Sequence, residues 1–174
     1  VATTSKFMRV LESDAKVLHF SGHGGSSQCV CFESDFGAVH PLFPADVDKI
    51  LQDYPPKLKL VFIASCFSES FAKVFQKMGV PWVVACRWSD PLWDEKANIF
   101  AEKFYENLFG GETVQQSFNK ARTKVEFCPD VHMSTDPSLH NEGNKYLLLA
   151  RDDTKDEVIF PAAEEGSQAN SSSS

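Results

Sequence analysis

Short apolar runs alternate with amphipathic segments along this chain, and this alternation strongly limits the folds it can adopt. The clearest run, 58–65, follows Pro55 and Pro56 and is typical of a strand buried on both faces of a parallel sheet. The runs at 16–21 and 81–86 are expected to be strands as well. Strands that alternate with helices predict a mostly parallel sheet with helices on its faces. We therefore expect functional groups at the edge where the carboxyl ends of the strands gather.

Apolar residues recur at helical spacing in five segments, and glycines follow several of them. One expected helix carries Phe7, Val10 and Leu11 on one face, with Thr4 or Ser5 as its cap. The other four cover about 45–52, 71–78, 97–108 and 114–125. Ser68 is expected to cap the third helix, and Gly79 to end it.

Four further segments carry strand signals. Two short apolar runs, 28–32 and 38–43, flank turn-forming residues and predict a hairpin. Tyr146–Ala150 is expected to form another strand, and Val158–Phe160 a short extended piece.

The 174 residues suffice for one ordinary domain, which we expect to cover residues 1–161. The segment 162–174 lacks large apolar residues and ends in four serines, which favours a disordered tail. The chain opens with Val1 and enters helical sequence almost at once, so we expect an upstream part of a longer protein to be missing.

Charge and cysteine content exclude several classes of protein. The net charge of −7, with no cluster of Lys and Arg, argues against binding to nucleic acid or to anionic membranes. No apolar run approaches the roughly 20 residues of a membrane span. The five cysteines are odd in number, and no secretory leader opens the sequence, which favours reduced thiols and a cytoplasmic location.

A histidine and a cysteine follow the ends of two predicted strands. His23 comes after the run 16–21, and Cys66 comes after the run 58–65. If these strands are neighbours, about 4.8 Å apart, both side chains enter one crevice. A cysteine thiolate is the nucleophile in such a pair, and the histidine transfers the proton. Gly24 and Gly25 allow the backbone to approach a substrate carbonyl, so their N–H groups and that of Cys66 are expected to form an oxyanion hole.

Other readings of these residues compete with catalysis. A cysteine at a buried strand end is usually a small core residue, and this reading is stronger still for Cys29, Cys31, Cys86 and Cys128. His19 is expected to make a core hydrogen bond or to orient the turn that carries His23. His40, His132 and His140 have no potential partner at a spacing that is typical of a catalytic or metal site. Cys29 and Cys31 lack the Cys-x-x-Cys spacing of structural zinc sites, so we expect no metal.

The glycine-rich segment Gly22–Ser27 also raises two alternative enzyme classes. It lacks the third glycine of a dinucleotide-binding turn and the lysine of a phosphate loop, so no nucleotide cofactor is expected. It is similar to the oxyanion segment of some esterases. The chain contains no Gly-x-Ser-x-Gly motif, which disfavours a serine hydrolase.

Three ordered blocks of sequence resemble the CHAT domains, a family of caspase-like cysteine peptidases. The first two are HFSGHGG at 19–25 and VFIASCFSES at 61–70. The third consists of Trp88, Asp94, Phe104, Tyr105, Leu108, Gly111, Ala121 and Arg122, in that order. The resemblance runs from about Thr3 to Ala150. It implies a caspase-like three-layer α/β/α sandwich with a His23/Cys66 dyad.

This resemblance also implies structure outside the present sequence. Family members have strands ahead of the histidine block, and their absence would expose a sheet edge, so we expect this chain to lack its N-terminal strands. Upstream helical repeats of the TPR type often regulate such domains. The sequence itself shows no repeats.

The expected function is hydrolysis of a protein or peptide substrate, and the family's specificity pocket is expected in the loop Arg87–Asp94. Trp88 supplies an aromatic wall, while Asp90 and Asp94 favour a basic residue before the scissile bond. The interval from Trp88 to Asp94 is two residues longer than usual, and Arg87 replaces an apolar residue. Arg87 is instead a candidate to pair with an acidic substrate residue or with Asp90. The alternative to an enzyme is a catalytically inactive interaction module.

Overall fold

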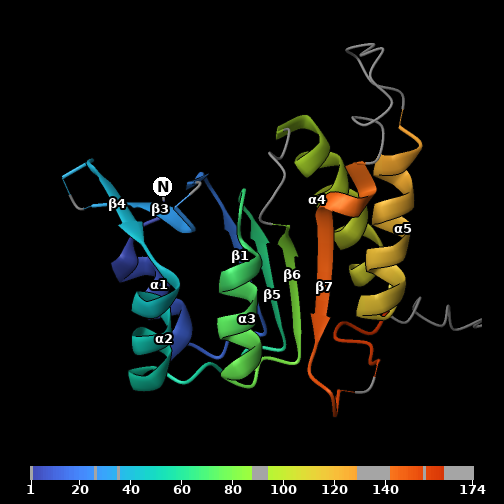
Figure 1. The fold of residues 1–174 in the computed structure, drawn as a ribbon. Coiled ribbons are helices and arrows are strands. Elements are labelled where there is room, and N and C mark those ends of the chain that lie inside the picture. Colours follow the sequence, from blue (N-terminus) through green and yellow to red (C-terminus); the bar gives the residue numbers. More distant parts are fainter. Residues whose placement is uncertain are drawn as a thin grey trace, which may run out of the picture.

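The computed structural model describes residues 2–25, 27–34, 36–87, 94–128, 142–154 and 156–162. Its main sheet has the strand order β1-β5-β6-β7 (Figure 1). These strands are β1 (Val17–Ser21), β5 (Leu60–Ala64), β6 (Trp82–Cys86) and β7 (Tyr146–Ala150). The first three are parallel, and β7 pairs antiparallel with β6. The prediction of a mostly parallel sheet is confirmed.

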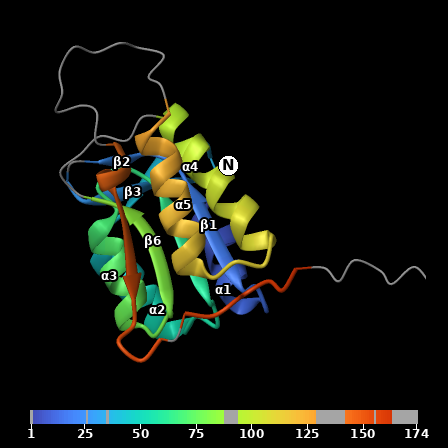
Figure 2. The ribbon, with the colours of Figure 1, turned by 90° about the vertical axis from the view of Figure 1, so that its right-hand side faces the viewer.

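Helices cover both faces of this sheet, which makes three layers (Figures 1 and 2). One face carries α1 (Thr4–Glu12), α2 (Pro44–Asp53) and α3 (Glu69–Lys77), and the other carries α4 (Asp94–Phe109) and α5 (Val114–Glu126). A short 3-10 helix, η2 (Glu142–Lys145), precedes β7.

The side chains of β5 alternate between these two layers, as a strand with period two requires. Val61 and Ile63 pack in the core with α1 to α3, while Leu60 and Phe62 pack in the core with α4 and α5. All four are at most 3% exposed. Burial on both faces explains why this run carries almost no polar residue.

A second, antiparallel sheet lies beyond the end of β1. It consists of β2 (Gly24–Gly25), β3 (Cys29–Glu33) and β4 (Val39–Leu42). The hairpin of β3 and β4 is confirmed, and Gly37 in its turn has a φ of +80°, which glycine adopts at little cost. The two-residue strand β2 was not predicted.

Several local expectations are wrong. Thr3, rather than Thr4 or Ser5, caps α1, with its Oγ1 accepting from the Lys6 N–H at 3.2 Å. Ser68 stands at the N-cap position of α3, but its side chain makes no capping hydrogen bond. Val158–Phe160 forms no strand. Ile159 packs in the core beside α4 and α5, and Phe160 packs on Phe109 with ring centroids 5.0 Å apart.

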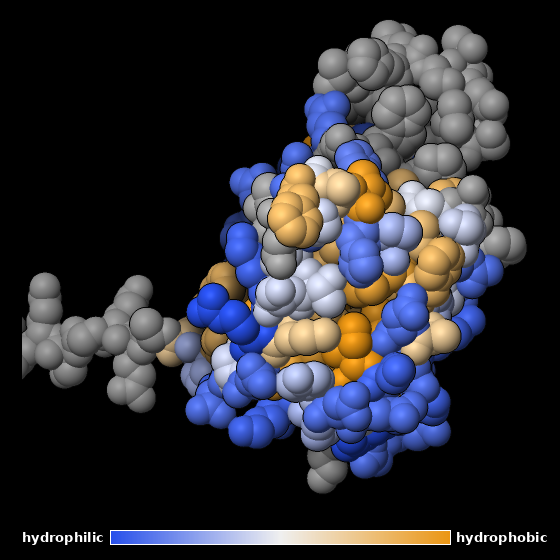
Figure 3. All heavy atoms as spheres, turned by 90° about the vertical axis from the view of Figure 1, so that its left-hand side faces the viewer, coloured by the Kyte–Doolittle hydropathy of each residue, from blue (hydrophilic) through white to orange (hydrophobic). Residues whose placement is uncertain are grey.

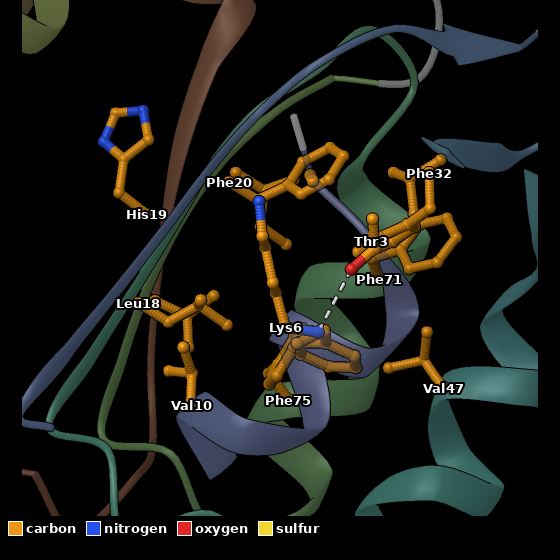
Figure 4. A pocket seen from close by; sticks show the side chains of 15 residues that line it. Thr3, Lys6, Val10, Leu18, His19, Phe20, Phe32, Val47, Phe71 and Phe75 are labelled. Carbon is orange, nitrogen blue, oxygen red and sulfur yellow. Dashed lines mark hydrogen bonds between the residues drawn. The ribbon is translucent and has the colours of Figure 1, made fainter. Parts of the chain in front are cut away.

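β1 is an edge strand of the described sheet, with β5 as its neighbour on one side. Leu18 and Phe20 face a largely apolar cavity of about 150 Å³ beside α1, whereas His19 points to the opposite side of the strand (Figure 4). The side of the molecule with α1, α2 and β4 also shows apolar surface among hydrophilic residues (Figure 3). Additional N-terminal strands remain a prediction, and β1 is the edge at which they would pair.

Candidate active site

The first two strands end side by side at the carboxyl edge of the sheet. Ser21 of β1 is in register with Ala64 of β5, and the Gly22 N–H donates to the Ala64 carbonyl at 3.2 Å. His23 and Cys66 each follow two residues after this pair. The parallel register therefore brings the histidine and cysteine segments to the same place.

A recess of about 360 Å³ opens at this edge. Its lining residues are Ser21, Gly22, His23, Gly24, Ala64, Cys66, Ala97 and Asn98. The His23 side chain is exposed and Cys66 is half-buried. The structure thus brings together three of the predicted site residues, His23, Gly24 and Cys66, around one opening.

The remaining predicted site residues are placed differently. Gly25 lies in β2 and is not part of the lining. Trp88 and Asp90 lie outside the described residues. Asp94 is the first residue of α4, and its side chain is outside the described part of the structure.

Sequence reasoning missed Ser21, Ala97 and Asn98 as lining residues. Ser21 ends the predicted strand before His23, and its small side chain gave no chemical signal. Ala97 and Asn98 lie in the first part of α4, where the helical pattern was visible. That pattern does not tell which end of the helix approaches the carboxyl edge of the sheet.

Cys66 lies in a turn between β5 and α3. Phe67 has a φ of +57°, a left-handed conformation that is rare for a bulky residue and costs roughly 1–3 kcal/mol. Helix α3 begins only at Glu69. Cys66 therefore does not open the helix but is separated from it by a strained turn. Strain of this kind clusters at functional sites, where the surrounding structure holds it in place.

The Ser68 hydroxyl holds this turn to the sheet. It donates to the Ile63 carbonyl at 3.3 Å and accepts from the Cys86 N–H at 3.0 Å. Ser68 is fully buried, so these bonds are shielded from water. This role explains why the hydroxyl does not cap α3: it already joins the ends of β5 and β6.

Gly24 approaches the cysteine segment closely. A Cβ atom on Gly24 would lie 1.9 Å from the Cys66 carbonyl oxygen and 2.7 Å from the Ser65 Oγ. Neither distance is physically tolerable, and the nearer atom belongs to the backbone. Only glycine fits between the histidine segment and the Cys66 turn without a shift of one of them.

The pairing of β2 with β3 orients the two glycine N–H groups differently. The Cys31 N–H donates to the His23 carbonyl at 2.9 Å, and Gly24 and Gly25 lie opposite Val30 and Cys29. Since hydrogen-bonded and non-bonded pairs alternate in an antiparallel ladder, the Gly24 N–H points away from β3 and the Gly25 N–H points toward it. Of the two, the Gly24 N–H is thus the group that does not pair with β3.

His19 is tied into the layer of α4. Its ring stacks on Phe62, with centroids 4.7 Å apart and planes 7° from parallel, and its Nδ1 lies 2.9 Å from the Tyr105 hydroxyl. Partial burial lowers the pKa of His19, and burial raises the pKa of Tyr105. Both shifts favour the neutral forms. The bond to Tyr105 is the expected hydrogen bond, but His19 is exposed at the edge strand and does not lie in the core as expected.

The other cysteines provide a contrast to Cys66. Burial raises the pKa of Cys86 to about 12, with a further contribution from the nearby Cys66, so its thiolate is disfavoured. The pKa of Cys31 is also raised, by desolvation and by its neighbour Cys29. Among the residues that the structure describes, no three His, Cys, Asp or Glu side chains are grouped so that they could hold a metal ion.

The fold and site define a class: a caspase-like α/β protein with a cysteine and a histidine at the carboxyl edge of a mostly parallel sheet. Residues 1–138 match the family model of the CHAT domain, and the chain belongs to this family. CHAT domains are related to caspase-like peptidases. No curated protein matches the chain significantly. In the described part of the structure, no helix has both the length and the apolar character needed to cross a membrane.

Proposed function

We propose that this protein is a cysteine endopeptidase in which Cys66 is the nucleophile and His23 the proton carrier. The observation that carries the proposal is the recess shared by His23, Gly24 and Cys66. His23 and Cys66 closely follow two neighbouring parallel strands, β1 and β5, so the main sheet fixes the relative positions of their segments. Membership of the CHAT family supports the same chemistry.

In the proposed reaction, His23 takes the proton of the Cys66 thiol, and the thiolate attacks the carbonyl carbon of the scissile peptide bond. The oxygen of the tetrahedral intermediate accepts hydrogen bonds from the Gly24 and Cys66 N–H groups. His23 then protonates the leaving amine, and the C–N bond breaks to give a thioester. Water, deprotonated by His23, hydrolyses this thioester and returns the Cys66 thiol.

We assign the residue before the scissile bond a basic side chain. The proposed determinants are the carboxylates of Asp90 and Asp94, with Trp88 as a wall. Arg87 was the candidate for the opposite preference. Its Nε donates to the Asn144 carbonyl at 2.7 Å, and its N–H donates to the Lys145 carbonyl at 2.8 Å. These bonds tie the end of β6 to η2, which supports a structural role for Arg87.

The regulation and location of the enzyme are part of the same proposal. We place it in the cytoplasm, where thiols stay reduced; none of the five described cysteines forms a disulfide. Its activity is controlled by helical-repeat or partner domains, as the family resemblance implies. Its substrates are proteins or peptides, and neither nucleic acid nor a membrane is a partner.

Replacement of the nucleophile tests the proposal. We expect Cys66→Ala to abolish thiol-dependent cleavage of a peptide library while the melting temperature stays close to that of the parent, because little volume is removed. Cys86→Ala and Cys128→Ala serve as controls that keep activity. Alkylation by iodoacetamide, followed by mass spectrometry, should label Cys66 before Cys86 or Cys128.

Two results would contradict the assignment. One is cleavage at the parent rate by Cys66→Ala. The other is preferential labelling of Cys86 or Cys128. A parent protein that binds partners, cleaves no peptide and shows no preferential labelling of Cys66 would instead support the alternative of an inactive interaction module.

A further inference from the structure

We infer that the recess beside Cys66 binds the substrate side chain next to the scissile bond, and that Asn98 is a further determinant of which side chain it accepts. This inference rests on the proposed function. It adds a residue of α4 to a site that otherwise comes from the ends of β1 and β5.

The shape of the recess supports the first part. Side chains alternate along each strand, and Ser21 and Ala64 share the face of the sheet covered by α4 and α5. The recess therefore extends from the Cys66 turn into the gap between the sheet and α4. Small residues (Ser21, Gly22, Ala64 and Ala97) form much of its wall. They leave room for a side chain whose backbone lies at Cys66.

The chemistry of the lining supports the second part. Asn98 is the longest polar side chain in the wall apart from His23, which the reaction uses. It is exposed, and the structure shows no hydrogen bond from its amide to the described residues. An asparagine amide offers one acceptor oxygen and two N–H donors. Apart from His23, the Asn98 amide is therefore the lining group best able to form hydrogen bonds with a substrate side chain in the recess.

Helix α4 holds Asn98 in a fixed position. Phe100 and Phe104 are fully buried and anchor the helix to the sheet through contacts with Phe62. The amide oxygen of Asn98 accepts hydrogen bonds, and the proposed basic preference selects this group over the amide N–H donors. The substrate class is therefore a side chain with N–H donors, such as Lys, Arg or Gln.

A charged residue at position 98 should also change which substrate charge the recess prefers. Its described lining contains no carboxylate, and His23 is its one ionisable side chain other than the Cys66 thiol. A carboxylate at position 98 forms charge-assisted hydrogen bonds with a basic side chain, which are about twice as strong as neutral ones. An ammonium group there repels the same side chain and attracts an acidic one.

The experiment uses four peptidyl acyloxymethyl ketones that differ only in the residue next to the reactive group: Lys, Gln, Leu or Glu. The rate of Cys66 alkylation is measured by intact-mass spectrometry. We expect Asn98→Asp to raise the Lys-to-Glu rate ratio about ten-fold over the parent, and Asn98→Lys to lower it by about the same factor. Asn119→Asp and Asn119→Lys, at an exposed position on α5, make the same charge changes as controls and should leave the ratio unchanged.

The outcomes separate the inference from the proposed function. In one outcome, the parent protein is alkylated at Cys66 while the Asn98 variants give the same Lys-to-Glu rate ratios as the Asn119 variants. This result overturns the role of Asn98 but leaves the proposed peptidase function standing. If no probe alkylates Cys66 in the parent, the proposed function fails and the inference fails with it. Melting curves of all variants confirm that the compared proteins are folded.

Discussion

At the scale of single residues, the site depends on a close backbone contact as much as on reactive side chains. Gly24 lies against the Cys66 carbonyl, and Phe67 adopts a left-handed conformation directly after the cysteine. Neither feature involves a reactive side chain. Both fix the distance between the histidine segment and the cysteine turn.

Gly24→Ala should therefore disable the site. Its Cβ would meet a backbone oxygen at 1.9 Å, so either the His23 segment or the Cys66 turn must shift. A displacement of about 1 Å at a reacting centre costs on the order of 100-fold in rate, and we expect at least that loss in kcat/KM. Gly25→Ala is the control, because its Cβ would meet the movable Cys29 and Ser27 side chains, at 2.8 and 3.5 Å. Equal activity of the two variants would show that the contact with Cys66 does not matter.

His19 predicts a pH dependence of stability. Partial burial lowers its pKa in the folded state below the ordinary value of 6.5, so the unfolded chain binds the proton more readily. The stabilisation is fully present above pH 6.5 and is lost as the pH falls through the folded-state pKa. When the pH is lowered from 8 to 5, the melting temperature of the parent should fall by more than that of His19→Gln. His40→Gln, at an exposed site on β4, should behave like the parent, and parallel curves for all three proteins would refute the prediction.

At the scale of elements, the hydrogen bonds of Ser68 connect the ends of β5 and β6. Ser68→Ala leaves the buried Cys86 N–H without this acceptor and removes the donor to Ile63. A buried polar group left unpaired costs about 1–3 kcal/mol, and we expect that loss in the free energy of unfolding, measured with urea.

Ser70→Ala, in the first turn of α3, is the matched control. The Ser70 Oγ is buried and has no hydrogen-bond partner in the described part of the structure, so its removal should be neutral or slightly stabilising. If both variants unfold at the same urea concentration, the bridging role of Ser68 is wrong.

The main elements were predictable because their hydrophobic periods are strong. The run 58–65 and the helical face of Phe71 and Phe75 are local patterns that burial in the structure matches. Strand β2 has no such pattern, because two glycines carry no side chains and their pairing depends on β3. Ser68 was misassigned for a related reason. A serine before a helix favours a cap, but the competing Cys86 N–H lies 18 residues away in the sequence.

The candidate site was predictable only in part. The approach of His23 to Cys66 follows from the rule that parallel strands end at one edge, so two strand ends suffice to predict it. Asn98 was missed, because the sequence does not specify which residues of α4 face that edge. The predicted contributions of Trp88 and Asp90 lie outside the described residues.

At the scale of the whole molecule, the helical layers reach the open edge of the sheet from both sides. On one side, Phe7 and Val10 of α1 line the cavity with Leu18 and Phe20. On the other, Tyr105 contacts His19 and stacks on Phe109, which is 58% exposed. An edge strand with apolar surroundings is a template for pairing, and proteins normally cover such an edge.

A chain that continues N-terminal to Val1 with the strands implied by the family resemblance should therefore be more stable than the present one. A strand paired with β1 buries apolar surface, including that of the cavity beside Leu18 and Phe20, and satisfies the backbone groups of the edge. We expect a higher melting temperature for the extended protein and weaker concentration-dependent association, measured by thermal melts and analytical ultracentrifugation. Phe20→Ala provides the internal check. Because Phe20 faces the cavity, its truncation should destabilise the extended protein more than the present chain, where the side chain is only partly buried. An extended protein with an unchanged melting temperature, or equal losses from Phe20→Ala in the two proteins, would show that no strand pairs at this edge.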